Sequence, residues 1–391
     1  MTEVTTDVST RRRRRGLIAV IASITIVGIM ISAVAPLLSL NLERRDVGPA
    51  WNGLLAAMPP LAALIFGIFM PMIIRRIGGA SAIYLGAGAS AIALLLFPVF
   101  QQLPAWFVLR FAMGVGITIV WIVSEAWVNA LAPEKNRGAV MGIYVTVLCM
   151  GLASGPLVLG FMGSGGARPF IATAIILAIA LLPIPLASGS GAPSFHDRQV
   201  IPLASAFRQA PVIMIAALLN GAIWTTQLAL LPVYGVRVGL PEGKALLLLT
   251  ALILGMSVLQ LPIGRLLDKW SGRSVLFLCG TVQCLGAIAL PFVVHDTVLV
   301  WLSLMIWGGF LAGLYTTEMT MIGRSFATKE LPGASTVFTM AFNFGALSGP
   351  AVAGIAMQIW DPHGILVVIG AAGAGVATMS ISLTHAKQSA W

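Results

Sequence analysis

Residues 151–160 read Gly-Leu-Ala-Ser-Gly-Pro-Leu-Val-Leu-Gly, and residues 345–354 read Gly-Ala-Leu-Ser-Gly-Pro-Ala-Val-Ala-Gly. Six of the ten positions are identical, at an offset of 194 residues. The loop glycines Gly78 and Gly272 are separated by the same 194 residues. Chance similarity between glycine-rich segments does not explain a shared offset. We therefore predict that the chain contains two copies of one structural unit.

The repeated Gly-Pro segment predicts a close and bent helix contact. Glycines at four- and five-residue spacing remove side chains from one helix face, and the proline bends the helix axis. Ordinary small-residue packing explains one such helix equally well, but it explains a pair at equivalent positions less well. The residues concerned are Gly151, Gly155, Pro156, Gly160, Gly349 and Pro350.

The amino-acid composition is that of a membrane protein. Of the 391 residues, 58% are hydrophobic and only 9% are charged, and the mean hydropathy is +0.97. A water-soluble domain has about a quarter of its residues charged, so this chain cannot cover itself in water. Its apolar residues form long blocks, such as 17–40 and 80–100, that contain no Asp, Glu, Lys or Arg. Each block can cross a bilayer, which takes roughly 20 residues of helix.

Twelve such blocks indicate an all-α integral membrane protein with two pseudo-symmetric six-helix bundles. The first half, residues 1–187, has predicted spans at 17–40, 51–74, 80–100, 105–129, 139–163 and 169–187. The second half, residues 211–391, has predicted spans at 211–234, 245–267, 274–294, 297–323, 333–360 and 364–384. The stretch 188–210 contains Gly, Ser, Pro and charged residues, as expected of a cytoplasmic linker.

The Lys and Arg residues are unevenly distributed between the two sides. If the N-terminus is cytoplasmic, the inner gaps hold 17 of them, including the run Arg11–Arg15, and the outer gaps hold five. Basic loops resist translocation, so we expect a multi-pass membrane protein with both termini in the cytoplasm. This orientation accounts for the net charge of +10, and we expect no binding of nucleic acid.

We expect neither a cofactor nor a metal. Cys149, Cys279 and Cys284 lie inside apolar blocks, where they fit packing better than a disulfide or a metal site. The four histidines fall in gaps or in the tail, and the sequence has no nucleotide-binding motif. An ion gradient is then the simplest energy source. The expected partners are a small-molecule substrate, protons and the lipid bilayer, with the chain acting as a monomer.

Apart from Arg265, which lies near the cytoplasmic end of the span 245–267 and is counted with the inner gap, three charged residues lie inside the predicted spans: Arg110, Glu125 and Glu318. A charge at mid-bilayer depth costs about 2.5 to 3.5 kcal/mol on insertion scales, so it is usually paired, hydrated or functional. Arg110, Thr118, Trp121 and Glu125 follow helical spacing and share one face. At 1.5 Å per residue, Arg110 and Glu125 are about 22 Å apart along the helix. They therefore do not pair, and we predict that this face lines a path.

Glu125 and Glu318 occupy nearly equivalent places, one residue away from the common offset. Burial disfavours the charged form of a carboxyl group, so substrate or conformation can control its proton. This favours a role in proton coupling, for which Glu125 is the best candidate. The alternative is a salt bridge to Arg75, Arg76 or Arg137 that merely locks an inner gate, and the sequence leaves both interpretations open.

Polar and aromatic side chains within the spans are candidates for substrate binding. Polar groups at this depth seek partners in a ligand or in another helix, and interhelical hydrogen bonding explains each of them singly. Tryptophan rings could form walls for an apolar or cationic substrate, although packing explains them as well. The candidates are Thr118, Trp121, Asn220, Trp224, Gln227, Trp307, Tyr315 and Asn343.

Four stretches carry recognisable motifs. The loop after the eighth span reads Gly264-Arg-Leu-Leu-Asp268-Lys269-Trp-Ser-Gly272-Arg273, and the fourth span contains Arg110-Phe-Ala-Met-Gly114-Val-Gly116. The fourth span also contains Ser124-Glu125-Ala-Trp127-Val-Asn129, which Arg137-Gly138 follows. These stretches resemble motifs of the major facilitator superfamily, namely G-x-L-x-D-R, R-x-x-x-G-x-G and the segment between spans four and five of its YcaD-like bacterial branch. Residues 151–160 resemble its antiporter motif g-x-x-x-G-P-x-x-G-G, departing at Leu159.

The resemblance extends over nearly the whole chain and implies alternating access between two six-helix halves, with the substrate bound near mid-membrane. The first-half copy of the loop motif, from Pro71 to Gly78, lacks the leading Gly and the Asp. Other pairs would therefore have to hold the gate there. The inner-gate loop residues that the resemblance implies are Arg75, Arg76, Arg137, Gly264, Asp268, Lys269 and Arg273.

From the antiporter motif we expect secondary active transport by proton-coupled export of a drug or metabolite. The alternative is proton-coupled import of a sugar, an amino acid or a carboxylate. A membrane enzyme, a channel or a receptor belongs to a different class. An enzyme would need a convergent set of catalytic residues, which the sequence does not show, and a channel would pass far more than one substrate per conformational cycle.

Overall fold

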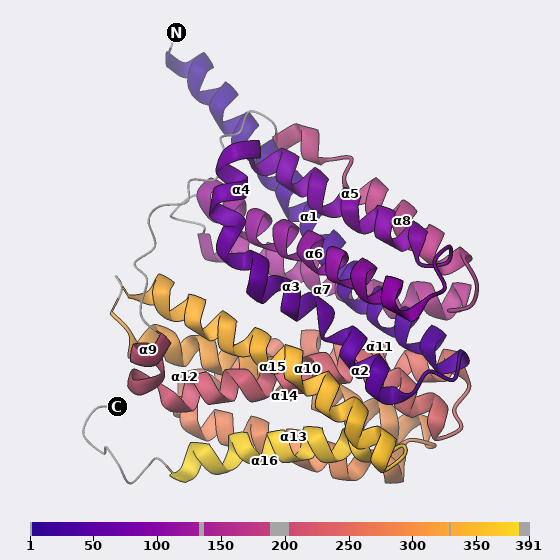
Figure 1. Ribbon diagram of the computed structural model, residues 1–391. Coiled ribbons are helices and arrows are strands. Elements are labelled where there is room, and N and C mark those ends of the chain that lie inside the picture. Colours follow the sequence, from indigo (N-terminus) through magenta and orange to yellow (C-terminus); the bar gives the residue numbers. More distant parts are fainter. Residues whose placement is uncertain (1, 133–136, 188–202, 328–329, 383–391) are drawn as a thin grey trace. The chain divides into compact units, whose positions relative to one another are not determined.

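The computed structural model describes residues 2–132, 137–187, 203–327 and 330–382 (Figure 1). Within these residues, helices are the only regular secondary structure, and no strand is present. This confirms the all-α class that the composition predicts. Arg137 begins a described helix, but its side chain lies outside the described part of the structure.

The described residues before the linker form eight α-helices and two short 3-10 helices. They are α1 (Thr2–Arg44), α2 (Pro49–Ala56), α3 (Met58–Phe66), η1 (Gly67–Phe69), α4 (Met70–Ile77), α5 (Gly79–Leu96), α6 (Leu103–Leu131), α7 (Arg137–Met162), α8 (Arg168–Ala180) and η3 (Ile184–Ala187). The chain after it forms α9 (Leu203–Gln209), α10 (Pro211–Arg237), α11 (Glu242–Val258), α12 (Gln260–Lys269), α13 (Gly272–Val293), α14 (Thr297–Ser325), α15 (Leu331–Ile359) and α16 (Gly364–Ser382).

Each of the twelve predicted spans falls on helical structure. Ten described stretches are long and apolar enough to cross a membrane, and an eleventh is the pair α11 and α12, which is bent by 41°. The sixth predicted span corresponds to α8, a shorter apolar helix, followed by a turn and η3. The architecture is therefore that of a twelve-span membrane protein.

The second predicted span, 51–74, is not one continuous helix. It is divided among α2, α3, η1 and α4. Pro59 and Pro60 stand in the first turn of α3, and Pro71 stands in the first turn of α4. Proline has no backbone N–H to donate to the preceding turn, so it is tolerated at the start of a helix and not in the interior. The three prolines therefore coincide with new helix starts.

The chain divides into two compact units. Unit 1 contains Met1–Leu37 and Leu61–His196, and unit 2 contains Leu38–Pro60 and Asp197–Trp391. The segment 38–60, which the repeat assigns to the first half of the sequence, thus belongs to unit 2. A Cβ atom on Gly53 of α2 would overlap the carbonyl oxygen of Pro350 in α15, and one on Gly354 would overlap that of Pro49. Direct backbone contact between α2 and α15 holds the segment there.

In unit 1, the glycines of the repeated motif pack α7 against α1. A Cβ atom on Gly151 would lie 2.8 Å from the carbonyl oxygen of Thr25, and one on Gly28 would lie 2.7 Å from that of Leu148. Gly155 packs in the same way against Ser32. Gly160, the last glycine of the motif, has no neighbouring atom within 4 Å of such a Cβ. Gly151 and Gly155 of the motif and Gly28 on α1 are therefore needed for the close approach of the two helices, and Gly160 is not.

In unit 2, the second copy of the motif makes the equivalent contact between α15 and α10. A Cβ atom on Gly221 would overlap the carbonyl oxygen of Phe342, and Gly345 and Gly349 are packed against the α10 backbone at Leu218 and Ala222. Pro156 and Pro350 are both buried. The repeat seen in the sequence is thus matched by the same type of helix pairing in each unit.

Candidate functional site

A buried carboxyl group and a buried amide meet inside unit 2. Glu318 on α14 and Asn220 on α10 are both 0% exposed, and the Asn220 amide Nδ2 donates a hydrogen bond of 2.9 Å to Glu318 Oε2. Glu318 Oε1 and Asn220 Oδ1 have no hydrogen-bond partner. Among the described residues, no cation forms an ion pair with Glu318. An ionised carboxylate at this place would be left without a counter-charge, which is costly in a low-dielectric interior.

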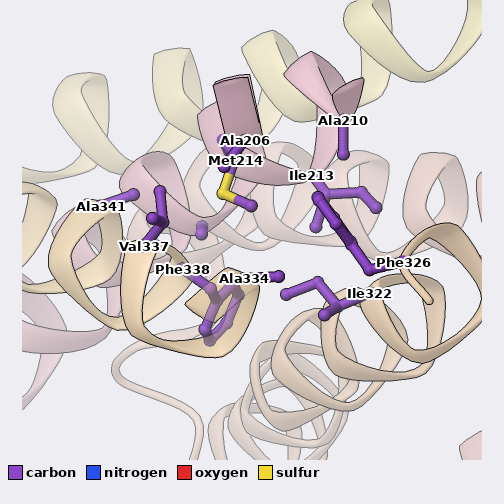
Figure 2. Packing of buried hydrophobic residues seen from close by; sticks show 11 residues of the cluster. Ala206, Ala210, Ile213, Met214, Ile322, Phe326, Ala334, Val337, Phe338 and Ala341 are labelled. Atoms are coloured by element: carbon purple, nitrogen blue, oxygen red, sulfur yellow. The ribbon is translucent and has the colours of Figure 1, made fainter. Parts of the chain in front are cut away.

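An apolar cluster is built from residues of α9, α10, α14 and α15 in unit 2 (Figure 2). Ala217 precedes Asn220 by three residues on α10, and Ile322 follows Glu318 by four residues on α14, so each lies one helical turn away on the same face. The cluster also includes Ala206 of α9. Its members are Ala206, Ala210, Ile213, Met214, Ala217, Ile322, Phe326, Ala334, Val337, Phe338 and Ala341.

An aromatic cluster lies one helical turn away on the other side. Trp224 follows Asn220 by four residues, and Tyr315 precedes Glu318 by three. The Phe342 ring on α15 joins them, with its centroid 6.4 Å from that of Trp224 and 6.0 Å from that of Tyr315. Tyr315 is 40% exposed. The carboxyl–amide pair therefore has apolar side chains of the cluster one turn away on one side and the aromatic rings one turn away on the other.

Two further substrate candidates belong to a separate hydrogen-bond network within unit 2. The Gln227 amide donates to Gln283 Oε1 at 3.2 Å, and the Gln283 amide donates to the backbone carbonyl of Trp307 at 2.9 Å. The Trp307 indole N–H donates back to the carbonyl of Gln283 at 3.1 Å. All three residues are buried. The network ties α10, α13 and α14 together, so the contacts of Gln227 and Trp307 are those of helix packing.

Asn343 is half-buried on α15, and its side-chain amide donates to the carbonyl of Thr339 on the same helix at 2.9 Å. This hydrogen bond lies within α15 and uses the side-chain nitrogen of Asn343, not its side-chain oxygen. The structure therefore does not bring Asn343 into either the carboxyl–amide pair or the glutamine network.

In unit 1, the polar stripe on α6 has a buried cation at one end and an exposed acid at the other. Arg110 is 4% exposed, and its Nε and Nη1 atoms have no hydrogen-bond partner in the part of the chain that the structure describes. Thr118 is buried, and its hydroxyl donates to the Gly114 carbonyl at 2.8 Å. The Trp121 indole N–H donates to Glu125 Oε2 at 3.2 Å, and Glu125 is exposed. The two acids in equivalent places therefore have different surroundings, with Glu318 buried and Glu125 exposed.

The residues expected at an inner gate stand at helix ends. Arg75 and Arg76 are exposed in the last turn of α4, while Asp268 and Lys269 are exposed in the last turn of α12. Gly264 lies within α12, where a Cβ atom would meet no other atom within 4 Å, and Arg273 is half-buried in the first turn of α13. None of these residues takes part in the ion pairs described next.

Three ion pairs gather at the opposite end of unit 2, where α1, α10 and α15 terminate. Arg237 is the last residue of α10. Its Nη1 atom lies 2.8 Å from Asp361 Oδ1, and its Nη2 atom donates a hydrogen bond of 3.2 Å to Glu43 Oε2. Arg44 pairs with Glu242 at the start of α11. Glu43 and Arg44 belong to the segment 38–60. Electrostatic contacts thus join that segment to the rest of unit 2.

Sequence reasoning missed Gln283, Phe338, Phe342 and the Arg237 ion pairs. Gln283 could have been found, because it is an amide in an otherwise apolar predicted span. Phenylalanine is ordinary in a membrane span, so Phe338 and Phe342 carried no signal. Their role depends on which helices meet, and a single sequence does not contain that information.

Comparison with known proteins identifies relatives over almost the full length. The profile of the family described as Major Facilitator Superfamily matches residues 16–252 and 239–389. The MFS-type transporter YfkF of Bacillus subtilis (strain 168) is 25% identical over 385 residues, which are 94% of this chain and 94% of that protein. The MFS-type transporter YcaD of Escherichia fergusonii is 23% identical over 360 residues, covering 91% of this chain and 92% of that protein.

Solved structures show the same fold. The nucleoside transporter NupG superimposes with a TM-score of 0.75 at 13% identity, covering 95% of this chain and 98% of that chain. A D-xylose-proton symporter superimposes with a TM-score of 0.73 at 14% identity, covering 94% of this chain and 96% of that chain. At these identities the likeness concerns the fold alone. It confirms the architecture that the repeat and the hydropathy predict.

Proposed function

Because the chain belongs to the Major Facilitator Superfamily, we propose that it is a proton-coupled secondary transporter in which Glu318 carries the coupled proton. Transport then proceeds by alternating access, with the substrate near mid-membrane. The two sequence repeats, residues 1–187 and 211–391, are the bodies that move in this proposal, and residues 188–210 connect them. We further propose that both termini are cytoplasmic, as the distribution of Lys and Arg indicates.

The observation that carries the coupling proposal is the isolation of Glu318. Its carboxyl group is fully buried, has Asn220 as its one hydrogen-bond donor and retains an unsatisfied oxygen. A carboxylic acid at this place is neutral and tolerable, whereas a carboxylate needs water or a cation. Loss of the proton therefore favours a conformation in which this site is hydrated, and such a difference between two states is what couples proton movement to a conformational cycle.

The aromatic cluster supports a substrate site beside Glu318. Trp224, Tyr315 and Phe342 form an amphipathic wall one turn from the carboxyl group, and Tyr315 is open to the surface. Aromatic rings suit an apolar or cationic substrate. We assign Glu125 a lesser part in proton coupling, because it is exposed and already accepts a hydrogen bond from the Trp121 indole N–H.

We propose export as the direction of transport, because the Gly-Pro segment resembles the antiporter motif and both copies form close helix contacts. Proton-coupled import is the second candidate, because the chain is similar in fold to a D-xylose-proton symporter. A panel of toxic compounds separates the two in growing cells. An exporter makes cells more resistant when it is produced, and an importer makes them more sensitive.

The coupling proposal is tested with purified protein in proteoliposomes. Compounds that wild-type protein exchanges across the membrane are first identified by counterflow without a pH gradient. For those compounds, we expect Glu318→Gln to retain counterflow but to lose accumulation driven by an imposed pH gradient. The matched variant Glu125→Gln should retain both activities.

Accumulation driven by the pH gradient in Glu318→Gln would overturn the assignment of Glu318. Loss of counterflow together with accumulation in this variant would show that Glu318 acts in substrate binding or folding, and it would also contradict the assignment. Gradient-driven accumulation lost only in Glu125→Gln would move the coupling site to α6.

A further inference from the structure

A shallow groove of about 440 Å³ runs along the surface of unit 1 between the end of α7 and the beginning of α8. It is separate from the polar stripe on α6, and no role in the proposed transport cycle uses it. The lining residues are Phe161, Met162, Arg168, Ile171, Ala172 and Ile175.

The loop between the two helices sets the shape of the groove. α7 ends at Met162 and α8 begins at Arg168. Gly163 and Gly166 have φ angles of 73° and 69°, a region that glycine enters without the steric cost of a Cβ atom. The chain therefore reverses within five residues. This brings Arg168 to the end of the groove that Phe161 and Met162 form.

The walls of the groove are apolar and exposed. Phe161 is 90% exposed, Ile175 is 54% exposed and Ile171 is 44% exposed. The stretch Ile143–Met162 of α7 is a candidate membrane span, and α8 is an apolar helix in the position of the next span. Exposed apolar side chains on membrane-spanning helices face hydrocarbon. The walls are therefore suited to an acyl chain.

One charge stands at the end of these walls. Arg168 is exposed and is the groove's only charged residue. Within the described residues, its guanidinium group has no ion pair with an acid. It is also the first residue of α8, whose N-cap residue Ala167 makes no side-chain capping hydrogen bond. A guanidinium group without an acidic partner is a favourable place for a phosphate.

We propose that this groove binds one anionic phospholipid, with its phosphate at Arg168 and an acyl chain against Phe161, Ile171 and Ile175. The groove contains no carboxylate that could hold the amine of a zwitterionic headgroup. A lipid with net negative charge is therefore favoured over phosphatidylcholine. The proposal does not depend on the substrate or the direction of transport.

Native mass spectrometry of the purified full chain, titrated with phosphatidylglycerol or with phosphatidylcholine of the same acyl chains, tests the proposal. We expect wild-type protein to bind at least one phosphatidylglycerol more tightly than phosphatidylcholine. Arg168→Gln should weaken the binding of phosphatidylglycerol by about tenfold or more, because it removes the charge-assisted hydrogen bonds to the phosphate. The matched control is Arg75→Gln, which removes an exposed arginine at a different helix end and should leave this affinity unchanged.

The acyl contact is tested separately with Ala172→Trp, which fills the groove and leaves Arg168 in place. We expect this variant to lose the tightly bound phosphatidylglycerol as well. Equal affinity of wild-type protein for the two lipids would overturn the proposal, as would unchanged binding in Arg168→Gln. Full retention of the lipid in Ala172→Trp would show that it binds elsewhere and would overturn the proposal too.

Discussion

The hydrogen bond from Asn220 to Glu318 leads to a prediction about a single residue. Asn220→Ala removes the amide that donates a hydrogen bond to Glu318 Oε2 in the buried interior of unit 2. We expect it to lower the free energy of unfolding by about 1–3 kcal/mol, because a buried polar group left without its partner costs that much. Thermal unfolding of the protein in detergent gives the readout as a lower melting temperature.

The control for this prediction is the same substitution in a Glu318→Leu background. No carboxyl group is left to satisfy there, so Asn220→Ala should cost less than it does in the wild-type protein. Equal costs in the two backgrounds would mean that the bond contributes nothing beyond the separate packing of the two side chains.

Single residues were easier to predict than their contacts. Glu318 and Asn220 were each singled out, because a charge or an amide within a membrane span is rare and conspicuous. Helical periodicity shows which side chains share a face, but it does not show which faces of α10 and α14 meet. The pairing of these two residues therefore emerges only from the structure. The same limit applies to Phe342, whose ring joins Trp224 to Tyr315.

Two glycines of one motif give opposite predictions at the scale of the helix. Gly151→Ala places a methyl group 2.8 Å from the Thr25 carbonyl oxygen and forces α7 away from α1. We expect a clear fall in melting temperature, corresponding to about 1–3 kcal/mol of overpacking. Gly160→Ala meets no atom within 4 Å. It should leave stability unchanged or raise it slightly, because alanine is the better helix former.

Melting curves of the two variants in the same detergent check this prediction. The two substitutions add the same methyl group to the same helix, so differences in helix propensity largely cancel. Equal melting temperatures would show that the contact between α1 and α7 relaxes without cost.

Elements were predictable where one strong signal dominates. The absence of charges over some 20 residues is sufficient to locate a span, and the predicted spans at 105–129 and 274–294 correspond to α6 and α13. The breaks within spans were missed. Pro59, Pro60 and Pro71 were visible in the sequence, but the hydropathy of a span is insensitive to interruptions of its helix. A kink or a new start therefore needs its own signal, which proline provides.

At the scale of the molecule, the repeat and the compact units divide the chain differently. The repeat has a period of 194 residues and assigns residues 38–60 to the first half, whereas contacts assign this segment to unit 2. Sequence similarity records a duplication, and contacts record one conformation of the folded chain. A segment that belongs to one repeat but packs with the other part of the chain is a suitable element to change partners during a transport cycle.

The ion pairs of Arg237 predict how firmly that segment is held. Arg237 and Glu43 are only 22% and 17% exposed, so solvent screens their attraction less than it screens a pair on the open surface. Arg237→Gln removes the contacts to both Glu43 and Asp361. We expect this change to increase the fraction of time for which the segment 38–60 is detached from the rest of unit 2.

A cysteine at Ser39, which is 3% exposed within the segment, reports this detachment. With the three native cysteines replaced, the rate of maleimide labelling of Ser39→Cys in detergent should rise several-fold in Arg237→Gln. Arg237→Lys keeps the charge but loses the forked geometry of the guanidinium group, and it should give an intermediate rate. Lys244→Gln removes a neighbouring cation on α11 that takes part in none of these pairs, and labelling should stay at the parent rate. If Arg237→Gln labels no faster than Lys244→Gln, close packing of α2 on α15 holds the segment by itself, and the charges serve another purpose.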